Sequence, residues 1–587
     1  MPSLDDALAL SATYMNRVHP TFPIIGQLGL ERQLTRYLSR PTEKPPLKWL
    51  AIINLIFAIG AKYTLLTDLN WYARNCDHDV YFQRAKELAL YSETIFDHPD
   101  LQTIQVFGLM SYYLLAVDQV NRAWQIIGIG VRAATALGLD MRMGSAQPSL
   151  VAKEMRYRVW WALYSLEHQL CGMTGRITCI SDKDYTTPLP VPMLEKDFGT
   201  RIGKKLLSQE YQRGPRAPAS DLRTLSVYES SATPIALKWV EEVQPNTALY
   251  FLHHVQICHL TQLVFHTLYS PITIRATWSD VQSQIADLDQ KIEHWHRQLP
   301  PAFDFRIVHS DGEFVDIRLG LGFFYYATKQ MIFRPCLCRL DRKLLHQSKK
   351  SSDFNHVAVT TCVASAQQQL TLISDEPDAV GLLKAGPWIS ILHFLVQCAT
   401  VLMLELSFRA QHMPDQADDL FADSQKVVRW LHALGNRNLA AARAWKLCTQ
   451  MLHRAATRMG RSCEHIPQEP PSSTDLHGDD PEKQSNMDSG PQSAGPAKGT
   501  NFVPSMPKAN MSMLNMPILS AFSALDHFMQ YDQYFPVFDV DTTQMEYQHT
   551  VNQIRSENMQ SAPESDMDFM YQYTDAPGSE WPNFGWQ

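Results

Sequence analysis

The chain has 587 residues, of which 45% are hydrophobic and 19% are charged, and this composition is typical of globular proteins. Collagen-like chains, coiled-coil rods and wholly disordered chains are therefore excluded, and a core of this size needs no disulfide or metal. The 52 Lys and Arg against 60 Asp and Glu give a net charge of −8, so the whole chain lacks the positive charge of a general nucleic-acid binder.

Helical patterns joined by short turns fill residues 1–193. The nearly all-apolar segment Trp49–Tyr63 predicts a buried helix. We expect Asp100 to cap a helix that ends near Val117, and Asn121 to cap a second helix that Gly138 ends. Because so few residues join them, these two helices are predicted to be antiparallel neighbours. Small residues allow their backbones to approach: Gly108, Gly128, Gly130 and Ala133. A further helix is predicted over Leu150–Leu170.

Residues 194–235 are rich in Gly, Pro, Ser and charge, and we predict a loop there. Helices are expected again over residues 236–460, from near Tyr250 and from Asp280. Further helices are predicted at Arg318–Phe333, His356–Ile373, Trp388–Phe408, Gln425–Leu434 and Leu439–Thr457. No segment alternates as a strand does, so the predicted fold is all-α, a multi-helix body of antiparallel helix pairs. The charge-free stretch Trp388–Leu404 approaches a membrane span in length, but its polar residues favour a core helix and no membrane contact.

The C-terminal part has a different composition. Eighteen of the 48 residues from 463 to 510 are Pro, Gly or Ser, so residues 461–518 are predicted to be a disordered linker. Residues 519–587, which we call the acidic tail, hold 11 acids, one base and 13 aromatic residues. Acids interleaved with aromatics are typical of amphipathic activation regions, and this aromatic content argues against the alternative of disorder that only aids solubility. Four aromatics are candidate contacts for a coactivator: Phe535, Phe538, Phe569 and Trp581.

No pattern predicts catalysis, and we expect the chain not to be an enzyme. Gly128–Ala133 fits the dinucleotide fingerprint G-x-G-x-x-A, but a helix and not a strand precedes it, which favours helix packing. His254 and Cys258 lie one helical turn apart, yet a zinc site needs two further ligands. The alternative is a set of scattered, partly buried histidines. Asp182 and Asp184 are interpreted as loop and cap residues.

Two segments carry a family resemblance. Asn121–Leu139, NRAWQIIGIGVRAATALGL, resembles the fungal-specific transcription factor domain, the all-helical middle region of zinc binuclear-cluster activators. Arg156–Glu167, RYRVWWALYSLE, resembles the end of that domain's signature. The resemblance covers about residues 10–460. The residues that we take as its structural signature are Asn121, Arg122, Trp124, Arg132, Trp160, Trp161, Gly175 and Arg176.

The resemblance implies a nuclear transcription regulator whose helical body is regulatory or senses an effector. It also implies DNA binding through a six-cysteine zinc cluster before this region, but only Cys76 precedes Cys171. We therefore expect no cofactor within this chain, and zinc only in a cluster missing from it. Either the sequence is truncated or the regulator reaches DNA through a partner. Its other expected partner is the transcription machinery or a coactivator. The alternative function is a helical scaffold or small-molecule-binding protein that acts without promoter contact.

Overall fold

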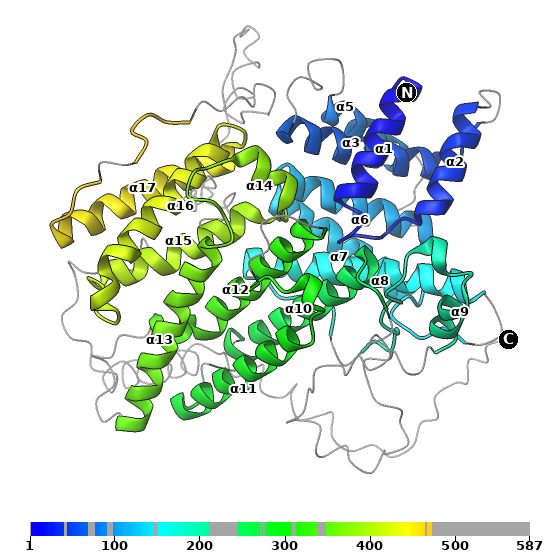
Figure 1. Ribbon diagram of the computed structural model, residues 1–587. Coiled ribbons are helices and arrows are strands. Elements are labelled where there is room, and N and C mark those ends of the chain that lie inside the picture. Colours follow the sequence, from blue (N-terminus) through cyan, green and yellow to red (C-terminus); the bar gives the residue numbers. More distant parts are fainter. Residues whose placement is uncertain are drawn as a thin grey trace, which may run out of the picture. The chain divides into compact units, whose positions relative to one another are not determined.

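The computed structural model describes residues 2–39, 44–67, 77–90, 98–144, 149–181, 184–209, 243–270, 273, 276–307, 313–338, 348–463 and 466–471. In this part of the chain there are 16 α-helices and no strand, so the all-α prediction is confirmed (Figure 1). The acidic tail and nearly all of the predicted linker lie outside the described residues. Of the linker, residues 461–463 and 466–471 are described, and they form no helix.

Helix α3 (Leu47–Thr67) is the core of the N-terminal region. It packs against α1 (Leu4–Arg17), α5 (His78–Leu90) and α6 (Leu101–Ala116), and α2 (Gln27–Ser39) lies between α1 and α3 in sequence. A Cβ atom on Gly60 would lie 2.7 Å from the Leu10 carbonyl oxygen, so α1 rests on the backbone of α3. Within the described ranges α3 alone is long and apolar enough to cross a membrane, and 83% of its most apolar window is buried, as in a core helix.

Helices α6 and α7 (Val120–Ala136) form the predicted antiparallel pair. Asp100 accepts from the Thr103 N–H at 2.8 Å, which confirms the expected cap. Gly138 has a φ of 72°, the left-handed conformation expected after the helix. The N-cap of α7 is Gln119 and not Asn121, so that prediction is wrong by two residues. Asp118 takes a left-handed φ of 61°, which turns the chain in fewer residues than we expected.

The next helix, α8 (Leu150–Thr174), holds a buried ion pair that fixes the segment after it. Glu154 Oε1 lies 3.2 Å from Arg158 Nε and accepts from the Val191 N–H at 2.7 Å. Arg158 in turn donates to the Met193 carbonyl at 2.6 Å. Since the acid, the guanidinium and two backbone groups satisfy one another, the pair can be buried at little net cost and holds residues 191–193 against α8.

The predicted loop at 194–235 is wrong at its beginning. A 3₁₀ turn (Glu195–Asp197) and helix α9 (Arg201–Ser208) occupy this stretch, and Thr200 caps α9 by accepting from the Gly203 N–H. Leu206 and Leu207 pack against Val191 and Phe198 in a small buried cluster. A helix of eight residues gives too few turns for its apolar periodicity to stand out among Gly and Lys. Residues 210–242 lie outside the described part.

Eight further helices form the C-terminal region. They are α10 (Thr247–Leu268), α11 (Trp278–Arg297), α12 (Val315–Leu337), α13 (Lys349–Leu370), α14 (Ala379–Ala385), α15 (Ile391–Ser407), α16 (Ala417–Gly435) and α17 (Leu439–Met459). Helices α13 and α16 begin earlier than predicted. Their first turns are polar, so the apolar pattern used for the prediction begins only later in each helix. In Figure 1 the green α12 and α13 run beside each other, and they pack together. This region meets the N-terminal one where α10 packs on α8 and α14 packs on α3.

Helix α12 contains Pro335, which has no N–H to bond the carbonyl of Met331 one turn earlier. The hydroxyl of Tyr269, the residue that follows α10, donates to that carbonyl at 2.6 Å. The Arg334 guanidinium lies over the Tyr269 ring at 5.3 Å. Tyr269 therefore replaces the missing helix hydrogen bond, which lets α12 continue through the proline.

Candidate functional site

Two of the three tryptophans of the predicted signature lie in the core. Trp160 and Trp161 are each 2% exposed on α8. The Trp161 indole N–H donates to the Pro188 carbonyl at 2.7 Å, and both rings pack against Tyr185. The Thr187 hydroxyl donates to the Leu139 carbonyl at 2.6 Å. These contacts bring the segment after α8 back over α7 and α8, and they give the tryptophans a structural role.

Trp124, the third tryptophan of the signature, is not fully buried. Its ring is partly exposed and the Arg176 guanidinium covers it at 4.7 Å. Gly175, with a φ of 65°, ends α8 in the left-handed conformation and turns the chain so that Arg176 reaches this ring. Because a guanidinium over an indole is stabilised by the ring's negative face, this cation–π contact closes the end of α8 against the start of α7.

The remaining signature residues act within α7. Arg122 donates to the Gln119 side chain at 3.0 Å, and Arg132 donates to the Gly128 carbonyl at 3.3 Å. Asn121 lies in the first turn. Gly128–Ala133 is wholly inside α7, which confirms helix packing and contradicts a dinucleotide loop. A Cβ atom on Gly130 would lie 3.2 Å from Phe107 Cβ, a direct contact between α6 and α7.

Glu167 forms a buried polar cluster below Trp124. Its Oε1 accepts from the Cys179 N–H at 2.8 Å and lies 3.7 Å from Cys171 Sγ. Burial raises the pKa of the Glu167 carboxyl. Burial also raises the pKa values of the Cys171 and Cys179 thiols, and the nearby Glu167 raises them further. A thiol with a raised pKa is a poor nucleophile, so this cluster has the character of a structural site.

The histidine and cysteine pair of α10 is also buried. His254 Nε2 lies 3.7 Å from Cys258 Sγ. Burial lowers the pKa of His254 to about 4 and raises the pKa of Cys258 to about 12. Among the residues that the structure describes, no three His, Cys, Asp or Glu side chains converge as a metal site would require. Phe535, Phe538, Phe569 and Trp581 lie outside those residues, as does Asp182; Asp184 is an exposed loop residue.

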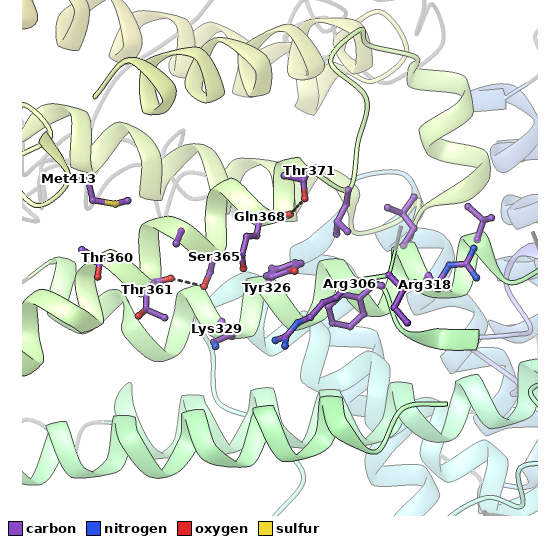
Figure 2. Close-up of a pocket in the computed structure, with 16 residues that line it drawn as sticks. Arg306, Arg318, Tyr326, Lys329, Thr360, Thr361, Ser365, Gln368, Thr371 and Met413 are labelled. Atoms are coloured by element: carbon purple, nitrogen blue, oxygen red, sulfur yellow. Dashed lines mark hydrogen bonds between the residues drawn. The ribbon is translucent and has the colours of Figure 1, made fainter. Parts of the chain in front are cut away.

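One candidate for ligand binding is a groove of about 880 Å³ between α12 and α13, which we call the α12–α13 groove. Figure 2 shows the hydroxyl side chains of α13 along one wall, with Tyr326 and Lys329 of α12 and the nearby Arg306 opposite. Thr361 and Ser365 donate their hydroxyl protons to carbonyls one turn earlier. Their oxygens therefore remain available as acceptors along this wall.

Acids compensate the cations of the groove. Glu293 on α11 lies 2.7 Å from Lys329 and 3.3 Å from Arg306, and the Tyr325 hydroxyl donates to it. Burial opposes ionisation of Glu293, but Lys329 and Tyr325 outweigh it and lower its pKa to about 2. Lys329 also pairs with Asp289 at 3.1 Å. Acids thus neutralise Lys329 and Arg306, whereas the third cation of the groove, Arg318, donates to the carbonyls of Ala302 and Glu313.

Sequence reasoning did not find this groove. Its residues come from the segment after α11, from α12, from α13 and from the turn near Met413, and no motif joins them. The only local signal is the polar pattern of α13, where Thr360, Thr361, Ser365 and Gln368 recur on one face. That pattern is typical of any exposed helix face and does not by itself indicate a ligand site.

Comparison with known proteins identifies the class. Residues 12–297 match the model of the fungal specific transcription factor domain, and the chain is similar to fungal transcription regulators. The curated proteins that resemble the chain include a transcription regulator and a transcription factor. The matched segment runs from α1 through α11, and therefore across the boundary that we predicted at 194–235. No solved structure matches the chain.

Several curated regulators are similar to this chain. The transcription regulator galc of Aspergillus niger is 30% identical over 503 residues, which are 80% of this chain and 60% of that protein. Protein STB5 of Saccharomyces cerevisiae is 34% identical over 187 residues, 30% of this chain and 25% of that protein. The C6 finger domain transcription factor hasF of Aspergillus fumigatus is 25% identical over 222 residues, which are 33% of this chain and 29% of that protein. The chain thus spans 60% or less of each relative's length.

Proposed function

We propose that this chain regulates transcription in the nucleus, with the helices of residues 1–193 and 236–460 as its regulatory body and the acidic tail as its activation region. The observation that carries this proposal is the similarity to a transcription regulator along 80% of the chain, together with the domain match at residues 12–297. The polar groove between α12 and α13 agrees with a binding protein.

The composition of the acidic tail supports its role. Its 11 acids keep the 13 aromatics hydrated in the free chain, and the aromatics provide apolar surface for a partner groove. A coactivator or a component of the transcription machinery that presents an apolar groove with basic edges fits this chemistry. DNA binding through a zinc cluster, either in a longer form of the protein or in a partner, belongs to the same proposal.

The tail can be tested apart from the body. Residues 519–587 fused to a neutral DNA-binding domain should activate a reporter gene. Replacing Phe535, Phe538, Phe569 and Trp581 with Ala should remove most of that activity, because these side chains supply the apolar contacts. Reporter output is compared at equal protein abundance, measured by immunoblot.

A matched variant controls for the number of substitutions. Replacing Gln533, Asn552, Gln572 and Asn583 of the same tail with Ala keeps every acid and every aromatic residue, and it should retain activity. Full activity after the aromatic substitutions would show that charge alone suffices. A tail that does not activate at all would favour the alternative, a helical scaffold or small-molecule-binding protein without promoter contact.

A further inference from the structure

A second cavity lies where the N-terminal and C-terminal helices meet, and we call it the junction cavity. Its volume is about 280 Å³. Its walls come from α1 and the turn after it, from α6 and α8, from α10 and α12, and from the segment between α14 and α15. Side chains far apart in sequence, including Arg17, Tyr112, His254 and Trp388, thus share one small space.

The walls of the junction cavity are aromatic. Phe22, Tyr112, Tyr250, Phe314, Phe324 and Trp388 all line it. Trp388 lies 6.1 Å from Tyr112 between ring centroids, and Phe324 meets His254 edge to face at 4.9 Å. A Cβ atom on Gly320 would lie 2.6 Å from the Tyr250 hydroxyl, so a glycine of α12 leaves room for this phenol. Flat walls of this kind favour a planar ligand that stacks or packs edge to face.

Three buried polar atoms in the walls of the junction cavity make no hydrogen bond of ordinary geometry within the described part of the chain. His254 is 4% exposed and its Nδ1 has no hydrogen-bond partner among the described residues. Trp388 is 8% exposed, and its Nε1 makes no hydrogen bond of ordinary geometry, although it approaches Tyr112 closely enough to influence that phenol's pKa. Ser165, 2% exposed, is likewise without a partner of ordinary geometry beside Cys258. Such groups are costly to bury unless something bonds them.

The two cavities differ in this respect. In the α12–α13 groove, Lys329 and Arg306 have acidic partners and the hydroxyls of α13 donate to backbone carbonyls, although one guanidinium nitrogen of Arg318 has no partner among the described residues. In the junction cavity the charged groups, among them Arg17 and Asp316, lie in exposed residues, and the interior is aromatic with unpartnered donors. The junction cavity is therefore the site that a ligand would complete.

We propose that the junction cavity binds a small planar aromatic compound of one or two fused rings that carries a carbonyl acceptor. The Trp388 indole N–H can only donate, so it requires an acceptor on the ligand, and the nearby hydroxyls of Ser165 and Tyr250 can donate to the same acceptor. The volume lies at the lower end of the range of about 300–1,000 Å³ for small-molecule sites. This inference rests on the proposed function, because a ligand here would join the two regions of a regulatory body.

Calorimetric titration of the full 587-residue chain tests the proposal with two bicyclic probes of similar size. Coumarin carries a carbonyl acceptor, whereas indole carries only an N–H donor. We expect coumarin to bind with a sub-millimolar dissociation constant and indole to bind about tenfold more weakly, as the loss of one good hydrogen bond predicts. Equal affinities would overturn the acceptor chemistry, and the absence of coumarin binding would overturn the site.

Two matched variants locate the bound probe. Trp388→Phe keeps a ring but removes the N–H, and it should weaken coumarin binding about tenfold. Trp295→Phe is the control, because Trp295 is 1% exposed and its Nε1 also lacks a partner, but it lies on α11 outside the cavity. The control should change the affinity less than about twofold. Equal effects of the two variants, or none, would overturn the location.

Hydrogen exchange on the wild-type chain supplies a readout that needs no variant. Coumarin should slow amide exchange in residues 384–390, which line the junction cavity, and leave residues 360–371 of the α12–α13 groove unchanged. Protection only at residues 360–371 would overturn the proposal in favour of the groove. The reporter test of the acidic tail uses no residue of the cavity, so failure here and failure of the proposed function are distinguishable.

Discussion

The substitution Tyr269→Phe tests how α12 continues through Pro335. It removes the hydroxyl that donates to the Met331 carbonyl at 2.6 Å and keeps the ring under Arg334. Burial raises the pKa of Tyr269 to about 12, so the hydroxyl is protonated and can donate at neutral pH. Leaving the carbonyl of the buried residue Met331 without a donor costs about 1–3 kcal/mol. We expect Tyr269→Phe to lower the free energy of unfolding by this amount.

The background Pro335→Ala isolates the hydrogen bond. Alanine at 335 supplies the N–H that a helix normally donates to the carbonyl four residues earlier. In that background Tyr269→Phe should cost less than about 0.5 kcal/mol, since the Met331 carbonyl keeps one donor. The coupling energy between the two substitutions is thus about 1–2 kcal/mol.

Urea unfolding of the four proteins, followed by circular dichroism, measures this coupling. The midpoint and the slope are both compared, because a large chain can depart from two-state behaviour. The same loss from Tyr269→Phe in both backgrounds would refute the reasoning. It would show that Tyr269 stabilises α12 through its ring and not through its hydroxyl.

Three further predictions concern charge. Glu154→Ala should lower the free energy of unfolding in urea by about 3–5 kcal/mol, because it leaves Arg158 buried without its acidic partner. The control Asp287→Ala breaks an exposed ion pair with the same i,i+4 spacing and should lower it by less than about 0.5 kcal/mol. Equal losses from the two substitutions would contradict this prediction. The pKa of Glu293, held at about 2 mainly by Lys329, lies below its ordinary 4.5, so the stability it adds is complete above 4.5 and is lost as the pH falls through about 2. After allowance for solvent screening this contribution is about 1–2 kcal/mol, and Glu293→Gln should remove it from the pH dependence of the melting temperature. The 587-residue chain alone should recover no consensus from random-site DNA at physiological salt, because its acidic tail carries a net −10; a recovered consensus would refute this.

Local chemistry in the sequence determined most of the helices. Apolar residues at helical spacing predicted α3, α6, α8 and α15, and a capping carboxylate at Asp100 and glycine at Gly138 fixed the ends of α6 and α7. These signals are short-range, since a cap or an apolar face depends on residues within one or two turns. The resemblance at residues 121–139 and 156–167 likewise predicted the fungal-specific transcription factor domain that matches residues 12–297, because contiguous segments carry the resemblance.

The tertiary structure decided the burial and the cavities. Trp124 and Trp160 both lie within predicted helices, yet Trp160 is buried in the core and Trp124 is partly exposed and covered by Arg176. The short helix α9 is stabilised because Leu206 and Leu207 pack against Val191 and Phe198. Local helix propensity cannot predict these tertiary contacts. In the junction cavity, His254 and Trp388 come together across more than 130 residues of chain. Sequence patterns record neighbours along one helix, whereas these sites depend on how separate helices pack, and that packing is set by the fit of side chains from all of them at once.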